Sequence, residues 1–198
     1  MEHRIQLTSI DVIASALEPV IPDLGSRLSS PDGAVTLMLS DIADAAEAAE
    51  QLGPDRWASL LRDHDALVEQ LLAHHDGQIV RRESDGFFAS FNSAHGGLRA
   101  AIELQRTFTG SAAGGERPLA LRVGLHSGFV IANPDQLMGR NVVLAARIAG
   151  KANPGEILIS SNVKQYTESD PTFRFDERGE HYFKGVHGEH ELFAVAWR

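Results

Sequence analysis

The sequence predicts an α+β sandwich, in which helices cover one face of a mostly antiparallel sheet. Two observations lead to this fold class. From residue 34 onward, helical and strand-like patterns alternate in the order β-α-α-β-β-α-β-α-β, and β-hairpins follow them. The chain has 198 residues, of which 43% are hydrophobic and 23% are charged. That length and that balance are typical of one folded domain with a short extension.

The first 33 residues are predicted to form that extension. Val12, Ala16 and Val20 recur near helical spacing, and Pro19 and Pro22 then break the pattern. A cluster of turn-forming residues follows at 29–33. We therefore expect a short amphipathic helix and a linker over residues 1–33, and the folded domain over residues 34–198.

Local patterns predict each element in the first half of the domain. The apolar run at 35–39 is typical of a fully buried strand, and a helical region follows over 43–73 with a break at Gly53-Pro54. Asp76-Gly77 is a strong turn signal, and a strand begins after it at 79–80. A second strand at 87–91 is joined to the first through a hairpin tip at 84–86. A helix over 94–108 and a flexible loop at 111–115 come next.

The second half is predicted in the same way. A long strand is expected within 119–131, where Leu121, Val123 and Leu125 alternate with other residues. A turn at 133–135 precedes a helix over 141–152, which the turn-forming residues 153–155 would end. Residues 157–159 read as a strand, and the segment from 172 to the end alternates and turns like a β-meander.

Composition and charge exclude several classes of function. The net charge is −9, with 27 acidic against 18 basic residues, so general nucleic-acid binding is not expected. The chain has no cysteine, which excludes disulfides, Cys-ligated zinc and thiol nucleophiles. No apolar run approaches the ~20 residues of a membrane helix, and no signal-peptide core follows the N-terminus. We therefore expect a cytoplasmic protein with no membrane partner.

Histidine is frequent, with nine residues, but its spacing is uninformative. No H-x-x-x-H or H-E-x-x-H pair of the metalloenzyme type occurs, so no zinc site is expected. His126 lies within a predicted strand, and we expect it to be structural.

Two carboxylates occupy positions where chemistry is plausible. Asp41 follows the first buried strand, and Asp85 lies at the tip of the predicted hairpin. If those strands are neighbours, both carboxylates meet at one edge, where they could bind a hard cation such as Mg²⁺. The alternative is that Asp41 caps the following helix and Asp85 only forms the turn.

Six segments, taken in order, resemble the catalytic domain of class III adenylyl and guanylyl (nucleotidyl) cyclases. The resemblance covers residues 34–197, nearly the whole chain after the extension. The segments are VTLMLSDI at 35–42, DGFFASF at 85–91, VGLHSG at 123–128, GRNVVLAARI at 139–148, PGEILIS at 154–160 and FKG at 183–185. Each segment alone is weak, but six in the right order make the resemblance strong.

The resemblance implies a ferredoxin-like fold and a homodimer with active sites at its interface. It implies conversion of a nucleoside triphosphate, ATP by family default, to a 3′,5′-cyclic nucleotide and pyrophosphate with two Mg²⁺ or Mn²⁺ ions per site. The positions that match the family's metal ligands are Asp41, Asp85 and the backbone carbonyl of Ile42. Arg147 matches the arginine that stabilises the transition state, and Lys184 matches a lysine that contacts the phosphates.

Helical spacing supports a phosphate-binding surface independently of the family. Arg140, Val143 and Arg147 are spaced i, i+3, i+7 and so share one helix face, with Gln136 four residues before Arg140. Two arginines beside an acidic pair could clamp a polyphosphate. The alternative is a solvated helix face on which Val143 touches the core.

The sequence departs from the family pattern at several positions. Arg81 stands where the family has a lysine that reads the base, and Gln136 is the nearest match to the second base-reading residue. Val143 replaces the asparagine that orients the ribose, and Ser84 replaces a glycine before the second aspartate. The usual small phosphate loop is replaced by residues 43–47, which include the acidic Asp44.

These departures leave three functions open. The first is an adenylyl or guanylyl cyclase. The second is a uridylate or cytidylate cyclase of the type that serves anti-phage signalling, because the forked donor of Arg81 suits a carbonyl-bearing base. The third is a nucleotide-binding or dimerisation module that has lost turnover.

Overall fold

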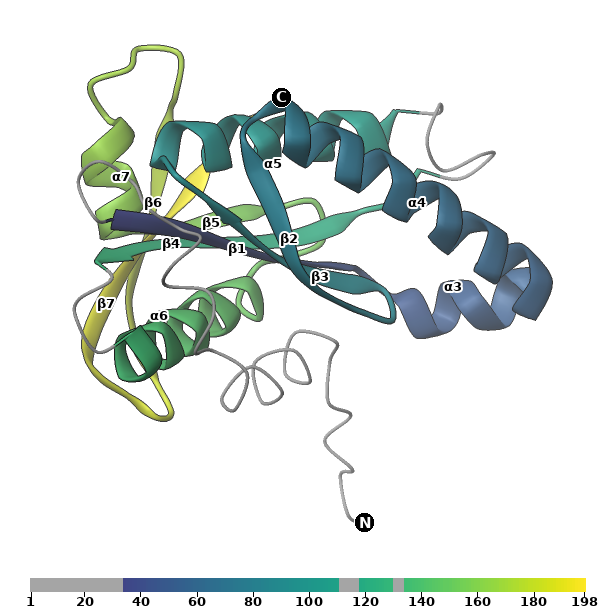
Figure 1. The fold of residues 1–198 in the computed structure, drawn as a ribbon, viewed down its shortest axis with the longest axis horizontal. Coiled ribbons are helices and arrows are strands. Elements are labelled where there is room, and N and C mark those ends of the chain that lie inside the picture. The colour runs from purple at the N-terminus through teal and green to yellow at the C-terminus, as the bar shows by residue number, and fades with distance from the viewer. Residues whose placement is uncertain (1–33, 111–117, 130–133) are drawn as a thin grey trace.

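The structure is a computed structural model that describes residues 34–110, 118–129 and 134–198. The predicted helix near residues 12–20 and the predicted loop at 111–115 lie outside these ranges. In the described part, seven strands form one sheet in the order β2-β3-β1-β4-β5-β7-β6 (Figure 1). The strands are β1 Ala34–Ile42, β2 Gly77–Glu83, β3 Gly86–Phe91, β4 Leu121–Phe129, β5 Ile157–Ser160, β6 Phe175–Phe183 and β7 Val186–Val195.

All neighbouring strands pair antiparallel except β4 and β5, which run parallel. Five helices complete the described fold: α3 Ala45–Leu52, α4 Pro54–His74, α5 Ala94–Thr109, α6 Pro134–Ala149 and α7 Ser161–Thr167. The predicted α+β class is therefore confirmed. Among the described helices, none combines the length and apolar character that a membrane span requires.

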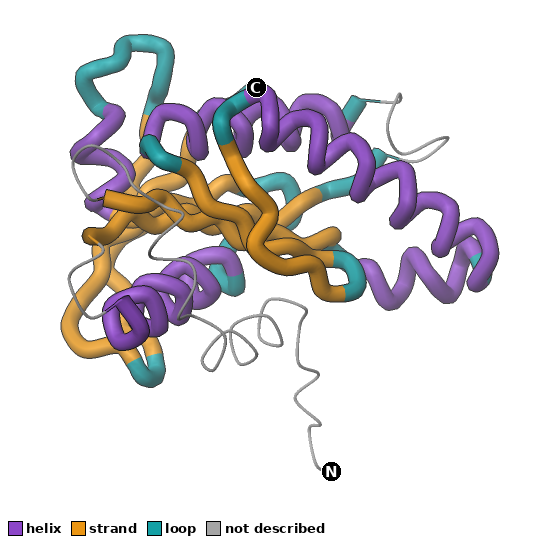
Figure 2. Tube along the Cα trace, viewed as in Figure 1, coloured by secondary structure: helices purple, strands orange, loops and turns teal. Residues whose placement is uncertain are grey.

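Helices cover both faces of the sheet, which corrects the expectation that they cover one (Figures 1 and 2). On β1, Leu37 and Leu39 pack with Ala145 of α6, whereas Met38 and Ile42 pack with the core beneath α4, α5 and α7. Because residues alternate across a strand, β1 needs apolar residues in both sets when both faces are covered. We call these two sides the α6 face and the α4–α5 face.

Two glycines on β4 let α6 approach the sheet closely. A Cβ on Gly124 would lie 2.2 Å from the backbone nitrogen of Ala149, and a Cβ on Gly128 would lie 2.4 Å from the Asn141 side chain. Both distances are shorter than real Cβ contacts allow. The absence of side chains at Gly124 and Gly128 therefore sets the depth at which α6 packs.

Most predicted elements are found, with two differences at helices. The break between α3 and α4 is confirmed, with Gly53 at a φ of 76° and Pro54 opening α4. The predicted turn at 133–135 is wrong in its described part, because Pro134 and Asp135 begin α6, seven residues before the expected start. Helix α7 was not predicted from the sequence.

The reason α7 escapes a sequence reading is its dependence on tertiary contacts. It has only seven residues, too few for a clear helical period. Val163 and Thr167 are buried, and the Asn162 side-chain amide donates to the backbone oxygen of Ser127 on β4 at 2.8 Å. Packing against the sheet thus stabilises α7 more than its own helix propensity does.

Candidate active site

The backbone holds Asp41 and Asp85 beside one another at one end of the β1–β3 pair. Asp41 lies opposite Gly86 in the register of these strands, and the backbone N–H of Ile42 donates to the backbone oxygen of Asp85 at 3.1 Å. Ser84, next to Asp85, adopts a left-handed φ of 49° in the β2–β3 turn. That conformation favours glycine, the residue that the resemblance led us to expect at position 84.

The structure excludes one of the two interpretations of Asp41. Helix α3 has Asp44 as its N-cap residue, so Asp41 does not cap the following helix. Asp41 instead lies inside β1 with only 1% of its surface exposed. Alternate residues of a strand share a face, so Asp41 lies on the same side as Leu37 and Leu39, which is the α6 face. Asp85 does lie in the turn between β2 and β3, as the alternative interpretation expected. It is half-buried there and lies next to β1.

Arg122 on β4 forms an ion pair with Asp41 that the sequence did not predict. Its Nε donates to Oδ1 at 2.9 Å and its Nη2 to Oδ2 at 2.5 Å. This two-pronged ion pair offsets the burial of the Asp41 carboxylate and fixes its orientation. A signal was present in the sequence, because Arg122 stands within the apolar alternation of Leu121, Val123 and Leu125, directly opposite Asp41 in the β1–β4 register.

Arg81 lies on the same face of the sheet as Asp41. A β-bulge between Ile79 and Arg81 places Arg81 opposite Phe88, whose side chain packs on the α6 face. The neighbouring Arg82 points to the other face, where it donates to Glu69 of α4 at 3.2 Å.

The guanidinium of Arg81 has a carboxylate partner that the sequence reading missed. Its Nη2 donates to Oε2 of Glu83 at 3.1 Å, and both side chains are about one-third exposed. Residues two apart on a strand share a face, so this pair was detectable from the sequence once the strand was assigned. Arg81 therefore stands beside an acceptor as well as being a donor.

The predicted surface on α6 is only partly exposed. Arg140 is exposed and Val143 and Arg147 are half-buried, whereas Val142 and Ala145 between them are buried against the sheet. Val143 contacts an apolar cluster formed with β5, β6 and β7, as expected for this one residue in the alternative interpretation. Gln136 lies in the first turn of α6, and its side chain lies outside the described part.

Lys184 is not brought near the carboxylates along the sheet. It is exposed in the turn between β6 and β7, and these strands form the edge of the sheet opposite β2. In the sheet order, β4 and β5 separate that edge from β1. Within one chain, Asp41, Ile42 and Asp85 therefore lie together, and Arg81 lies on the same sheet face as Asp41. Lys184 lies apart from them.

His126 lies on the α6 face but deep in the packing. Its Nδ1 lies 2.9 Å from the Ser160 hydroxyl, and its Nε2 lies 3.3 Å from Oδ1 of Asn141. Burial lowers the pKa of His126 to about 4, so the ring is neutral near pH 7. These contacts join β4 to β5 and α6, which supports a structural role.

The arrangement has the chemistry of a hard-cation site. Two carboxylates and a backbone carbonyl provide only oxygen donors, which Mg²⁺ and Mn²⁺ prefer. Arg122 uses one direction on each Asp41 oxygen, and a carboxylate offers about four lone-pair directions in all. The donor set therefore fits divalent cations even with the ion pair in place.

Comparisons with known proteins agree with this geometry. Residues 28–196 match the family model described as the adenylate and guanylate cyclase catalytic domain. An uncharacterised protein of Mycobacterium tuberculosis is 31% identical over 69% of this chain and 45% of its own length. A putative adenylate cyclase 3 of Rhizobium meliloti is 29% identical over 66% of this chain and 22% of its own length. The chain thus spans less than half the length of these curated relatives.

Solved cyclases share the fold. The adenylyl cyclase CyaB from P. aeruginosa superposes with a TM-score of 0.72 at 21% identity, covering 82% of this chain and 93% of that chain. The guanylate cyclase domain of RhGC from Catenaria anguillulae, solved in complex with GTP, gives a TM-score of 0.71 at 17% identity. The match to the second structure covers 83% of this chain and 96% of that chain.

Proposed function

Because the chain belongs to the adenylate and guanylate cyclase catalytic domain family, we propose that it is a nucleotidyl cyclase. It would convert a nucleoside triphosphate, ATP by family default, to a 3′,5′-cyclic nucleotide and pyrophosphate. One observation carries the proposal: Asp41 and Asp85 lie side by side at one end of the β1–β3 pair, with the Asp41 carboxylate oriented by Arg122.

Asp41, Asp85 and the backbone carbonyl of Ile42 would hold two Mg²⁺ or Mn²⁺ ions. Bound there, the ions would supply Lewis-acid activation of the ribose 3′-hydroxyl and charge compensation for the leaving pyrophosphate. The protein's part is to keep the Asp41 carboxylate in place, which the pair with Arg122 does without any rearrangement.

The arginines and Lys184 would act on the phosphates. As the 3′-oxygen bonds to the α-phosphorus, the bond from that phosphorus to the β-phosphate oxygen breaks, and the hydroxyl proton leaves to solvent. Arg147 would stabilise the negative charge that builds up on the α-phosphate in this step. Arg140, also on α6, and Lys184 on the β6–β7 turn would bind the polyphosphate.

The distribution of these residues supports a homodimer. The carboxylates belong to β1 and the β2–β3 turn, whereas the exposed Arg140 and the half-buried Arg147 belong to α6. Lys184 lies at the far edge of the sheet. A single chain thus presents two partial sites, and a second chain would complete each of them.

The base would be read by Arg81 together with Gln136. Arg81 carries Glu83 at hydrogen-bond distance, so the pair offers a base both a donor and an acceptor. The comparisons described above include a putative adenylate cyclase and solved adenylyl and guanylyl cyclases, and they give the pyrimidine alternative no support. ATP therefore remains the first substrate to test.

One observation favours a second candidate, a nucleotide-binding module without turnover. The family's ribose-orienting asparagine is Val143 here, and Val143 packs into an apolar cluster instead of presenting an amide. Loss of one transition-state contact costs about 10²- to 10³-fold in turnover. A slow cyclase and a silent binder are thus the two outcomes to separate.

A complementation assay tests the proposal. Asp85→Asn and Arg147→Ala would each be inactive with ATP, GTP, CTP or UTP and Mn²⁺, and mixing the two should restore part of the activity, because some heterodimers contain one intact site. Asp76→Asn is the matched control, since it makes the same change at an exposed turn residue. Nucleotide binding without product in the unmodified protein would favour the silent module. Full activity in Asp85→Asn would refute the assignment.

A further inference from the structure

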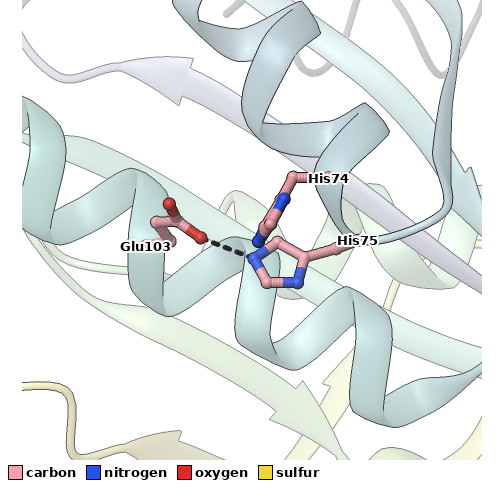
Figure 3. A group of neighbouring side chains, drawn as sticks. All are labelled: His74, His75 and Glu103. Carbon is pink, nitrogen blue, oxygen red and sulfur yellow. Dashed lines mark hydrogen bonds and ion pairs between the residues drawn. The ribbon is translucent and has the colours of Figure 1, made fainter.

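Three metal-ligating side chains gather outside the candidate active site, where the end of α4 meets α5 (Figure 3). His74 is the last residue of α4, His75 is its C-cap residue, and Glu103 comes from the middle of α5. One ligand atom from each lies within 4.8 Å of the other two. We propose that His74, His75 and Glu103 form a binding site for a first-row transition-metal ion such as Zn²⁺.

The donor set separates this site from the carboxylates on β1 and β3. Two imidazoles and one carboxylate suit Zn²⁺ and its neighbours, whereas sites made only of oxygen suit Mg²⁺ and Mn²⁺. The positions differ too, because α4 and α5 cover the sheet face opposite the one that carries Asp41. The molecule would therefore hold two kinds of ion on opposite faces of one sheet.

The present geometry needs only small movements to bind an ion. Nε2 of His75 lies 2.6 Å from Oε2 of Glu103, and the rings of His74 and His75 meet edge to face with centroids 5.0 Å apart. Ligands on a tetrahedral Zn²⁺ lie about 3.3 Å from one another, given bonds of about 2.0–2.1 Å. The His75–Glu103 contact must lengthen by less than 1 Å, and the exposed His74 ring can rotate toward it.

The surroundings favour a cation with one open coordination position. The carbonyl groups at the end of α4 carry partial negative charge, which attracts cations. His75 and Glu103 also line a pocket of about 360 Å³, which gives water room to complete the coordination.

Two arginines line the same pocket, and both have partners that limit their repulsion. Arg99 is paired with Asp170 at 3.2 Å, and Arg106 donates to the backbone oxygen of Trp197 at 2.9 Å. Their guanidinium groups are thus directed at other acceptors and not at the His75–Glu103 contact.

This site was not predicted from the sequence, because its ligands do not follow a single-helix pattern. His74 and His75 are adjacent, and Glu103 follows His75 by 28 residues on another helix. Only the packing of α4 beside α5 brings the three together, which is why a search for histidines four apart finds nothing.

Zn²⁺ titration of the full chain, free of any affinity tag, tests the proposal. Calorimetry in a buffer with excess Mg²⁺ keeps the oxygen-donor site out of the measurement. We expect one Zn²⁺ ion per chain and a rise in melting temperature of about 5–10 °C at a hundredfold excess over Kd. X-ray absorption should show two imidazoles on the ion.

Three variants decide whether these residues are the ligands. His74→Ala, His75→Gln and Glu103→Gln should each weaken Zn²⁺ binding roughly 100-fold or more. His74 is exposed, so His74→Ala keeps the fold even if changes at His75 do not. The exposed His187 provides the control, and His187→Ala should bind Zn²⁺ like the unmodified protein. The proposal is overturned if the unmodified protein binds no Zn²⁺, or if all three variants bind as tightly as it does.

Discussion

The neutral, buried His126 should make the protein lose stability in mild acid. Its pKa is lowered from 6.5 to about 4 by burial, whereas in the unfolded chain it returns to its ordinary value. The unfolded state therefore binds the proton more tightly between these values. The stability that His126 contributes is fully present above pH 6.5 and is lost as the pH falls toward 4.

The folded-state and unfolded-state pKa values of His126 determine how much stability is lost. Between pH 7.5 and pH 5, the linkage relation for pKa values of 6.5 and about 4 gives a loss of about 2 kcal/mol in the free energy of unfolding. Two carboxylates with shifted pKa values interfere little in this window. Asp65 and Asp170 have pKa values lowered from 3.8, chiefly by hydrogen bonds from His64 and Thr172, so their contribution is lost only at lower pH.

Urea unfolding at pH 7.5 and pH 5 measures the effect. His126→Gln keeps a polar side chain beside Ser160 and Asn141 but removes the titrating ring. The variant is less stable overall, yet its stability should change between the two pH values by about 2 kcal/mol less than that of the unmodified protein. If both proteins lose the same amount, the reasoning is refuted. A direct NMR titration of the His126 ring checks the same claim, and a midpoint near 6.5 would contradict it.

Two backbone predictions concern the packing of α6 and the β2–β3 turn. Gly124→Ala should destabilise the protein by about 3 kcal/mol in urea unfolding, because its Cβ would lie 2.2 Å from the Ala149 backbone. Gly150→Ala is the control. The nearest atom to its Cβ lies at 3.4 Å, so the free energy of unfolding should change by less than about 0.5 kcal/mol. Ser84→Gly should stabilise by about 0.5–1 kcal/mol, because Ser84 holds a left-handed φ of 49°, and a loss of stability there would contradict the strain.

The sequence predicted the strands well because their signals are local. The buried run of β1, the turn at Asp76-Gly77 and the hairpin tip before Gly86 each depend on a few adjacent residues. The boundary of α6 was harder, because a proline reads as a break although it also opens helices. Helix α7 could not be predicted at all, since contacts with β4 hold it.

The residues of the candidate site also differ in whether local signals could predict their positions. Asp41 and Asp85 were predictable because each ends or adjoins a recognisable strand. Arg122 and Glu83 were not, because a salt bridge needs the strand register, which the sequence does not state. Predicting the His75–Glu103 contact would require knowing how one helix packs against another.

The departures from the family pattern can now be sorted by what they do to the two carboxylates. Ser84 keeps the left-handed backbone that glycine would adopt, so the turn still places Asp85 beside β1. Asp44 is exposed at the start of α3 and its side chain makes no capping hydrogen bond. Val143 lies on α6, where it packs against an apolar cluster formed with β5, β6 and β7. None of these three changes disturbs the backbone that joins Asp41 to Asp85. The substitutions therefore spare the proposed metal ligands, so a loss of activity should appear in turnover or base choice before it appears in metal dependence.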